Sequence, residues 1–150
     1  MGAVFLIDYG HPARELHHPQ RSQGTLMCHY RHHAHHDPFH LPGLEDVTAH
    51  VDFTAIGRAL AVSGLSLQDF ASQGAWLLQN GLLDCLDPAY SPGSLEWLRQ
   101  STALQTLVHP SEMGESFKVL VALRDPHGQL SACLAGPGHA ATCARLGIAP

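Results

Sequence analysis

Long hydrophobic runs, paired cysteines and clusters of basic charge are all missing from this sequence. No stretch approaches the roughly 18 apolar residues that a transmembrane helix needs, and no basic segment followed by a long apolar stretch indicates a signal peptide. The formal net charge of −5, with histidines neutral, is not that of a protein that binds the phosphate backbone of nucleic acids. We therefore expect a cytoplasmic protein that neither binds nucleic acid nor inserts into a membrane.

Also missing are the short motifs that identify several classes of enzyme. The sequence has no GxSxG nucleophile turn, no GxGxxG dinucleotide turn, no P-loop and no HExxH metal motif. Its four cysteines form no CxxC pair and lie far apart, which favours free thiols in a reducing compartment over a disulfide framework. Nothing in these patterns supports nucleophilic catalysis, or nucleotide binding by this chain alone.

The residues that are present fit one globular domain of 150 residues, 45% of them hydrophobic. The apolar run from Val4 to Ile7 predicts a strand, and an uninterrupted run of this kind is typical of a buried, parallel, central strand. Such a strand needs neighbours on both sides, and the sequence before Val4 is too short to supply one. We therefore expect the chain to be a piece of a larger domain.

The clearest helix is predicted over residues 52–63. Phe53 and Leu60 fall on one apolar face at helical spacing, and Asp52 is in place to cap the N-terminus.

Two further strands and a helical pair complete the predicted domain. Residues 65–73 alternate between apolar and polar side chains, which predicts a half-buried strand. Residues 75–108 indicate an inserted pair of helices, and residues 117–124 a second central strand. Residues 125–150 show little pattern, and we expect a weakly structured tail there. The order of elements predicts a layered α/β fold for residues 1–124.

The segment between the first strand and the first helix is long and rich in histidine. Six imidazoles lie within twelve residues, at His29, His32, His33, His35, His36 and His40. A loop of this length in a compact domain is usually functional or disordered, and its apolar anchors favour an ordered loop packed over a sheet edge. If the segment were helical, histidines four residues apart could share a metal ion. A non-catalytic, histidine-rich interaction or metal-binding module is therefore the alternative, although we predict no dedicated metal site.

Asp8, Tyr9 and Gly10 end the first strand. Ligands of open α/β sheets bind beyond the carboxyl ends of the strands, so these residues stand where chemistry is usual. The alternative is that Asp8 caps the following turn and Tyr9 covers the sheet edge, and the sequence does not separate the two. Further carboxylates around the loop could form an acidic lip for a guanidinium group, or could be helix caps and solvated charges. They are Glu15, Glu45, Asp46 and Asp52.

Three runs of the sequence resemble one protein family. They are FLIDYGHPARELHHPQRSQGTLMCHYRHHAHHDPF, PGLEDVTAHVDFTAI and HPSEMGESFKVLVAL. Over about Gly2 to Leu123 they closely resemble the MidA family of S-adenosylmethionine-dependent methyltransferases. The resemblance implies a class I methyltransferase fold, a Rossmann-like sheet with one antiparallel strand. The chain would then hold the C-terminal portion of that sheet: three strands, the last one antiparallel and between the other two, with a long loop and an inserted helical pair.

The resemblance also implies an activity. The family includes the mitochondrial methyltransferase that helps to assemble respiratory complex I by modifying an arginine of one subunit, which implies a protein substrate of that kind. The implied cofactor is S-adenosylmethionine, bound only when the missing N-terminal half is supplied, because the family's glycine-rich cofactor motif is absent from this chain. A third possibility, independent of the resemblance, is a remnant that does not fold stably, in which an exposed edge at Val4 to Ile7 would drive homodimer formation or aggregation.

Site residues follow from the resemblance as well. Methyl transfer depends mainly on placing the nucleophile, the methyl carbon and the sulfur in line, and a guanidinium acceptor also needs a route by which to lose a proton. Catalytic residues on the acceptor side would be Asp8, Tyr9, His50 and Asp52. Substrate contacts would come from Gly10, His29, Tyr30, Arg31, Asp46 and Thr48. No cofactor-binding residue and no metal ligand is predicted.

Overall fold

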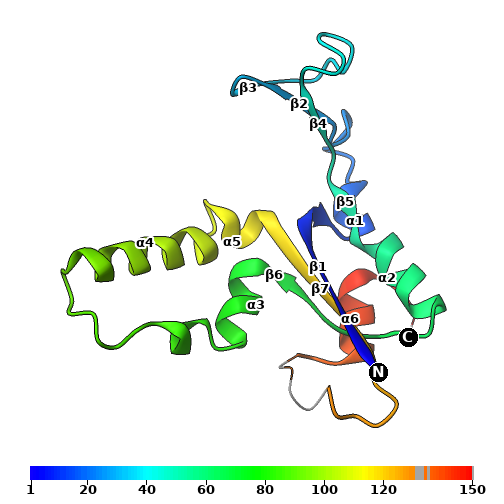
Figure 1. Cartoon of the computed structure of the whole chain (residues 1–150). Coiled ribbons are helices and arrows are strands. Elements are labelled where there is room, and N and C mark those ends of the chain that lie inside the picture. The colour runs from blue at the N-terminus through cyan, green and yellow to red at the C-terminus, as the bar shows by residue number, and fades with distance from the viewer. Residues whose placement is uncertain (131–133, 135, 150) are drawn as a thin grey trace.

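A computed structural model describes residues 1–130, 134 and 136–149 of the chain. Its larger sheet has four strands in the order β5-β1-β7-β6 (Figure 1). β7 runs antiparallel to both β1 and β6, whereas the short β5 runs parallel to β1. The bounds are β1 (Gly2–His11), β5 (Val51–Asp52), β6 (Ser66–Ser72) and β7 (Phe117–Arg124). The predicted α/β class is confirmed, and the strand over residues 117–124 does lie between the other two.

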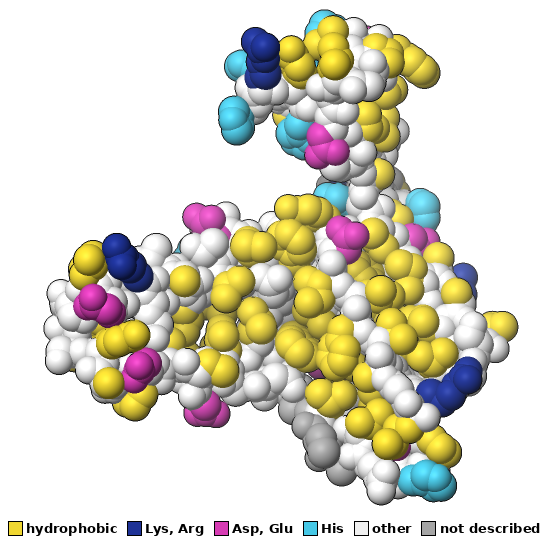
Figure 2. All heavy atoms as spheres, in the orientation of Figure 1, with side chains coloured by type: hydrophobic (Ala, Val, Ile, Leu, Met, Phe, Trp, Pro, Cys, Tyr) yellow, Lys and Arg dark blue, Asp and Glu magenta, His cyan; other side chains and the backbone are white. Residues whose placement is uncertain are grey.

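β1 is paired along most of its length on one side only. Residues Gly2 to Tyr9 pair with β7, whereas β5 joins β1 only at its last two residues. Phe5 and Ile7 remain 45% and 54% exposed. The prediction of a buried strand with neighbours on both sides is therefore wrong for the described residues, because one edge of β1 and one of its faces are open. Figure 2 shows many hydrophobic side chains on the surface over the sheet.

The helix after the histidine-rich segment begins where the sequence predicts. It is α2 (Phe53–Val62), and the Asp52 carboxylate accepts a hydrogen bond from the Ala55 amide at 3.0 Å. This bond satisfies one of the amides that the first turn of a helix leaves free, as expected for an N-cap residue.

The inserted helical pair is also confirmed. It consists of α3 (Gln73–Gln79), the 3-10 turn η1 (Leu82–Cys85) and the long α4 (Leu95–Val108), followed by the single turn α5 (Met113–Ser116). Gly81, with φ of 84°, ends the first of these helices, and Ser94 caps α4 by accepting from the Trp97 amide at 3.1 Å. α4 extends away from the sheet and has no buried residue (Figure 1).

The C-terminal segment differs from the weakly structured tail that the sequence predicts. It contains α6 (His139–Leu146), and Cys143 and Leu146 pack into the core beneath the sheet with Phe53 and Leu67. Buried Thr54 in α2 fixes the helix further, because its hydroxyl donates to the Leu146 carbonyl at 2.6 Å. The small side chains of this segment gave no periodic signal, but they allow α6 to approach β6 closely. Residues 131–133, 135 and 150 of the predicted tail lie outside the described part.

The histidine-rich segment forms structure of its own instead of packing over the sheet edge. After the single turn α1 (Ala13–Leu16), a second sheet has the order β3-β2-β4 with all pairs antiparallel. Its strands are β2 (Met27–Tyr30), β3 (His33–His35) and β4 (Asp46–Thr48). This sheet projects from the body of the molecule as an arm (Figure 1). The prediction of a loop packed over the sheet edge is therefore wrong.

Arg31 and His32 form the two-residue turn at the tip of this arm. Tyr30 and His33 pair on either side of them, and both turn residues have positive φ, 45° and 68°. Two positive φ angles between paired strands are the mark of a type I′ hairpin turn, which normally takes Asn-Gly. Two bulkier residues in this conformation cost backbone energy.

The remaining observations concern thiols and membrane insertion. Cys28, Cys85 and Cys143 are all free, as predicted for these three cysteines, and Cys133 lies outside the described residues. Within the described chain, no helix has both the length and the apolar character to cross a membrane.

Candidate functional site

A pocket of about 520 Å³ lies where the arm meets the carboxyl end of β1. This volume is within the roughly 300–1,000 Å³ typical of sites for small ligands. Apolar groups from Leu26, Met27 and Ala49 contribute to its wall. The polar and ionisable side chains include Tyr9, Arg21, His29, Asp46, Thr48 and His50.

Backbone pairing at two places brings these side chains together. β1 and β5 meet in parallel, with Gly10 opposite Val51, so the end of β1 lies beside the segment that contains His50. β2 and β4 pair with His29 opposite Asp46. The pocket therefore lies at the junction of the two sheets, beyond the carboxyl end of β1.

The segment before β5 is held to the arm by a side-chain hydrogen bond. The His50 amide donates to the Thr25 hydroxyl at 3.1 Å, and the Thr48 hydroxyl donates to the Met27 carbonyl at 3.3 Å. The first bond links the segment before β5 to the residues before β2, whereas the second lies within the arm, between β4 and β2. A substitution that removes the Thr25 hydroxyl would therefore remove a hydrogen bond that positions the His50 backbone.

Gly10 allows the close approach of β1 to β5. A Cβ atom at Gly10 would lie 2.4 Å from the Val51 carbonyl oxygen and 2.7 Å from the Phe53 ring. Neither neighbour can move freely, since one is backbone and the other is a fully buried side chain. Gly10 thus shapes the site through its lack of a side chain and offers no side chain to bind a substrate.

Five of the ten predicted site residues line the pocket. They are Tyr9, His29, Asp46, Thr48 and His50. Of the other five, Gly10 packs against Val51 next to the pocket. The remaining four, Asp8, Asp52, Tyr30 and Arg31, do not line the pocket.

Asp8 and Asp52 both bind backbone amides near them. For Asp52 this is the cap role that the alternative predicted, whereas Asp8 lies within β1, which continues to His11, and caps no turn. The Asp8 carboxylate accepts from the Tyr9 amide at 2.7 Å, and Asp52 caps α2. Neither lines the pocket.

Tyr30 and Arg31 lie at the tip of the arm and do not line the pocket. The Arg31 guanidinium carbon is 5.3 Å from the centre of the Tyr30 ring, within the range of a cation–π contact. The sequence placed these two residues beside His29, but successive residues of a strand point to opposite faces.

The acidic lip does not assemble, because its members have other partners. Glu45 is almost fully buried, and its carboxylate is 3.0 Å from the His35 ring. Glu15 lies between His11 and Arg14. Asp46 is the one carboxylate among the residues that line the pocket.

In its described part, the structure lacks the helix on which the metal-binding alternative depends. That hypothesis required a helical segment, whereas β2 and β3 form a hairpin in which His29 and His33 are not stacked on one face. Throughout the described residues, no three histidine, cysteine or acidic side chains are close enough to hold a metal ion.

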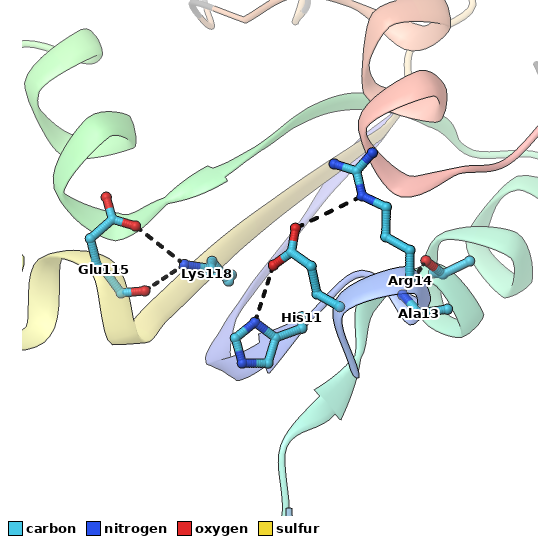
Figure 3. A network of polar contacts seen from close by, with 7 residues as sticks. His11, Ala13, Arg14, Glu115 and Lys118 are labelled. Carbon is cyan, nitrogen blue, oxygen red and sulfur yellow. Dashed lines mark hydrogen bonds and ion pairs between the residues drawn. The ribbon is translucent and has the colours of Figure 1, made fainter. Parts of the chain in front are cut away.

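His11 and His50 form a pair that the sequence analysis missed. Their ring centres are 5.0 Å apart with an angle of 55° between the planes. The His11 Nδ1 atom is 3.4 Å from the Glu15 carboxylate, which also lies 3.8 Å from Arg14 Nε (Figure 3). The spacing of His11 and Glu15, four residues apart, could have indicated the contact between those two residues, but no local signal links His11 to His50.

Burial and positive charge lower the pKa of both imidazoles. Burial is the largest cause for His11, followed by the Arg21 guanidinium and His50, while the Glu15 carboxylate opposes these effects and raises the pKa. For His50 the causes are burial and then Arg21. The lowered pKa of each ring favours the neutral imidazole, the form that can accept a proton.

Comparison with known proteins shows a similarity over the part of the chain that forms the pocket. Residues 1–71 match a family model described as "Putative S-adenosyl-L-methionine-dependent methyltransferase". The first part of the chain carries the sequence pattern of that family. No curated protein matches the chain.

Two solved structures from Burkholderia thailandensis share this fold. One is an uncharacterized COG1565 superfamily protein, 47% identical over 90% of this chain, with a TM-score of 0.77. The other is a COG1565 superfamily member bound to S-adenosyl-homocysteine, also 47% identical over 90% of this chain, with a TM-score of 0.75. The chain spans only 36% and 35% of the length of these two proteins.

Proposed function

We propose that this chain forms the acceptor-side part of an S-adenosylmethionine-dependent methyltransferase of the MidA type. The observation that carries the proposal is the pocket at the carboxyl end of β1, within the segment that matches the methyltransferase family model. That end of a strand is where open α/β sheets bind their ligands. About two-thirds of each Burkholderia chain has no counterpart here, so the complete reaction would require further polypeptide.

The pocket would take the methyl-bearing end of the cofactor but not the whole molecule. S-adenosylmethionine would supply an electrophilic methyl group when bound. Tyr9 and the apolar groups of Leu26 and Met27 offer a surface for that end. The sequence contains no glycine-rich turn that could cradle the rest, so those contacts would come from outside this chain. The S-adenosyl-homocysteine in a 47% identical structure supports this choice of cofactor.

The methyl acceptor that we propose is an arginine side chain of a protein. Asp46 offers a carboxylate to orient a guanidinium group, and the Tyr9 ring offers a face on which it could stack. An extended arm beside the pocket gives a protein substrate additional surface to contact, including Tyr30 and Arg31. A subunit of a respiratory complex, modified in the cytoplasm, is the substrate that the MidA resemblance favours.

The side chains in the pocket suggest separate roles. His50 would accept a proton from the acceptor nitrogen, and Asp46 and Thr48 would orient the acceptor. His29, on the strand that pairs with Asp46, would contact the substrate. Gly10 would permit the approach of β5 that brings His50 to the pocket.

A chimeric protein tests the proposal directly. The segment of the Burkholderia thailandensis protein that matches this chain is replaced by residues from this chain, and calorimetry measures binding of S-adenosylmethionine. We expect binding by the chimera and none by the isolated chain. Tight binding by the isolated chain would contradict the division of roles.

Activity of the same chimera tests the acceptor. It is incubated with radiolabelled S-adenosylmethionine and bacterial protein extract, and the labelled protein is hydrolysed for amino-acid analysis. Labelled methylarginine is the expected product. Label confined to other amino acids would refute the arginine acceptor, and a chimera that binds cofactor but transfers no label to protein would refute the protein substrate.

A further inference from the structure

His11 is the last residue of β1, and its side chain lies behind the pocket. The side chain is only 19% exposed and does not line the cavity, whereas its neighbour His50 does. Asp52, the residue opposite His11 in the pairing of β1 with β5, directs its carboxylate to the first turn of α2. His11 thus contacts His50, which lines the pocket, on one side and Glu15 of α1 on the other.

Glu15 approaches His11 from the far side. It is one turn further along the chain, in α1, and its carboxylate is 3.4 Å from His11 Nδ1. This is an ion-pair distance without the alignment of a hydrogen bond, and Nδ1 has no other partner among the described residues. A buried polar nitrogen without a second partner is costly unless the nearby carboxylate compensates for it. The chain therefore places a carboxylate, a partly buried imidazole and an imidazole of the pocket next to one another.

We propose that His11 is a positioning residue for His50, and that Glu15, His11 and His50 form a relay that keeps the His50 ring directed into the pocket. This inference rests on the proposed function. In that reaction a nitrogen of the acceptor forms a bond to the methyl carbon as the carbon–sulfur bond breaks and its electron pair stays on sulfur. The nitrogen must then lose one proton, which passes to a ring nitrogen of His50 and from there to solvent.

Charged groups that face the two rings come from three elements. Glu15 belongs to α1, Arg21 to the segment that follows it, and His50 to the segment before β5. The positive charge of Arg21 acts against protonation of both rings, and the carboxylate acts in favour of it at His11 alone. A proton on His50 would thus meet a repulsive field and leave readily.

Ring titrations of the intact chain by nuclear magnetic resonance test the coupling without any catalysis. His50→Gln should raise the pKa of His11 because it removes a repelling imidazolium, whereas Glu15→Gln should lower it. His17→Gln, at the exposed end of α1, is the matched control and should leave His11 unchanged. A His11 titration curve that is identical in the wild type and in His50→Gln would overturn the relay.

The chimera then tests the positioning role. His11→Gln should admit water behind His50 and raise its pKa, so the acidic limb of the pH–rate profile should move to higher pH. The maximal rate should fall about tenfold with the KM for the acceptor unchanged, a smaller loss than the 10²-fold or more expected for the direct proton acceptor in His50→Gln. An unchanged profile in His11→Gln would refute the role. If the parent chimera transfers no methyl group, the proposed function fails, while the titrations still decide whether the two rings are coupled.

Discussion

The carbonyl oxygen of Val51 occupies the space that a side chain on Gly10 would need, at a distance of 2.4 Å from an ideal Cβ. This close contact joins the end of β1 to β5 and so brings Tyr9 and His50 to one pocket. The site therefore requires that residue 10 has no Cβ atom, a condition that only glycine meets.

Gly10→Ala should destabilise the chain and open the pocket. The added methyl group meets the Val51 backbone and the buried Phe53 ring, and overpacking of this kind typically costs about 1–3 kcal/mol. Thermal unfolding measures the loss. Gly2→Ala is the matched control on the same strand, because nothing lies within 4 Å of its Cβ position. Equal unfolding temperatures for the two variants would contradict this account of Gly10.

Arg145→Ala should be strongly destabilising at neutral pH. Asp69 is fully buried, its carboxylate accepts from Arg145 at 3.0 Å, and removal of the cation leaves a buried charge without compensation. Loss of one partner of a buried pair typically costs about 3–5 kcal/mol, and the 48% exposure of Arg145 places the value toward the lower end. Arg58→Ala, an exposed arginine in α2, is the control and should have little effect.

The cost of Arg145→Ala should diminish as the pH falls. Burial raises the pKa of Asp69, although Arg145 and the Phe70 backbone oppose this. An acid whose pKa is raised on folding destabilises the fold above that pKa, and the penalty disappears as the group becomes protonated. Denaturant unfolding at several pH values should show the difference between variant and wild type shrinking toward acid pH. A constant difference would show that the carboxylate is not the cause.

Arg21→Gln should raise the pKa of both His11 and His50. The guanidinium is a cause of the lowered pKa at each ring, and its loss removes repulsion against the protonated form. Ring titration by nuclear magnetic resonance follows both shifts in one sample. Arg31→Gln at the tip of the arm is the control, and a comparable shift in that variant would mean that overall charge and not Arg21 sets the titration.

His32→Gly should stabilise the hairpin of the arm by about 0.5–1 kcal/mol. Its φ of 68° is the conformation that glycine adopts without a steric cost. Hydrogen exchange at the amides of β2 and β3 reports on this region without requiring global unfolding. His33→Gly, in the paired strand next to the turn, should have the opposite effect. Faster exchange in His32→Gly would show that the imidazole stabilises the turn.

We propose that the open edge of β1 pairs with a second copy of this chain. Gly2 to Tyr9 have no strand partner on that side among the described residues, and Ile7 on this strand is 54% exposed. Sedimentation should show that Ile7→Lys weakens self-association, whereas Phe39→Lys, on an 83% exposed side chain of the arm, should not. A wild-type chain that is monomeric at all concentrations would refute the homodimer.

Sequence alone was sufficient for the elements whose signals are local. The caps of α2 and α4 depend on a side chain and an amide three residues apart, and β7 is defined by its own apolar residues. The bounds of β7 match the predicted strand for this reason. Five of the residues that line the pocket were expected there from the resemblance to a known family, and the end of the first strand pointed independently to Tyr9 alone of the residues in this strand that line it.

The tertiary structure alone decided the features that depend on distant partners. α6 lacks a periodic apolar pattern and is held by contacts such as the bond from Thr54 to Leu146, 92 residues apart. The arm depends on the pairing of β2 with β3, across a turn that favours other residues, and on the pairing of β2 with β4 further along the chain. The His11–His50 pair depends on a contact between segments about 40 residues apart. Residue spacing in a sequence reports only on contacts within one helical turn or one strand. These contacts join distant segments, so they depend on the packing of the whole chain. The sequence, through its resemblance to a known family, therefore indicated several residues of the site, but their arrangement required the tertiary structure.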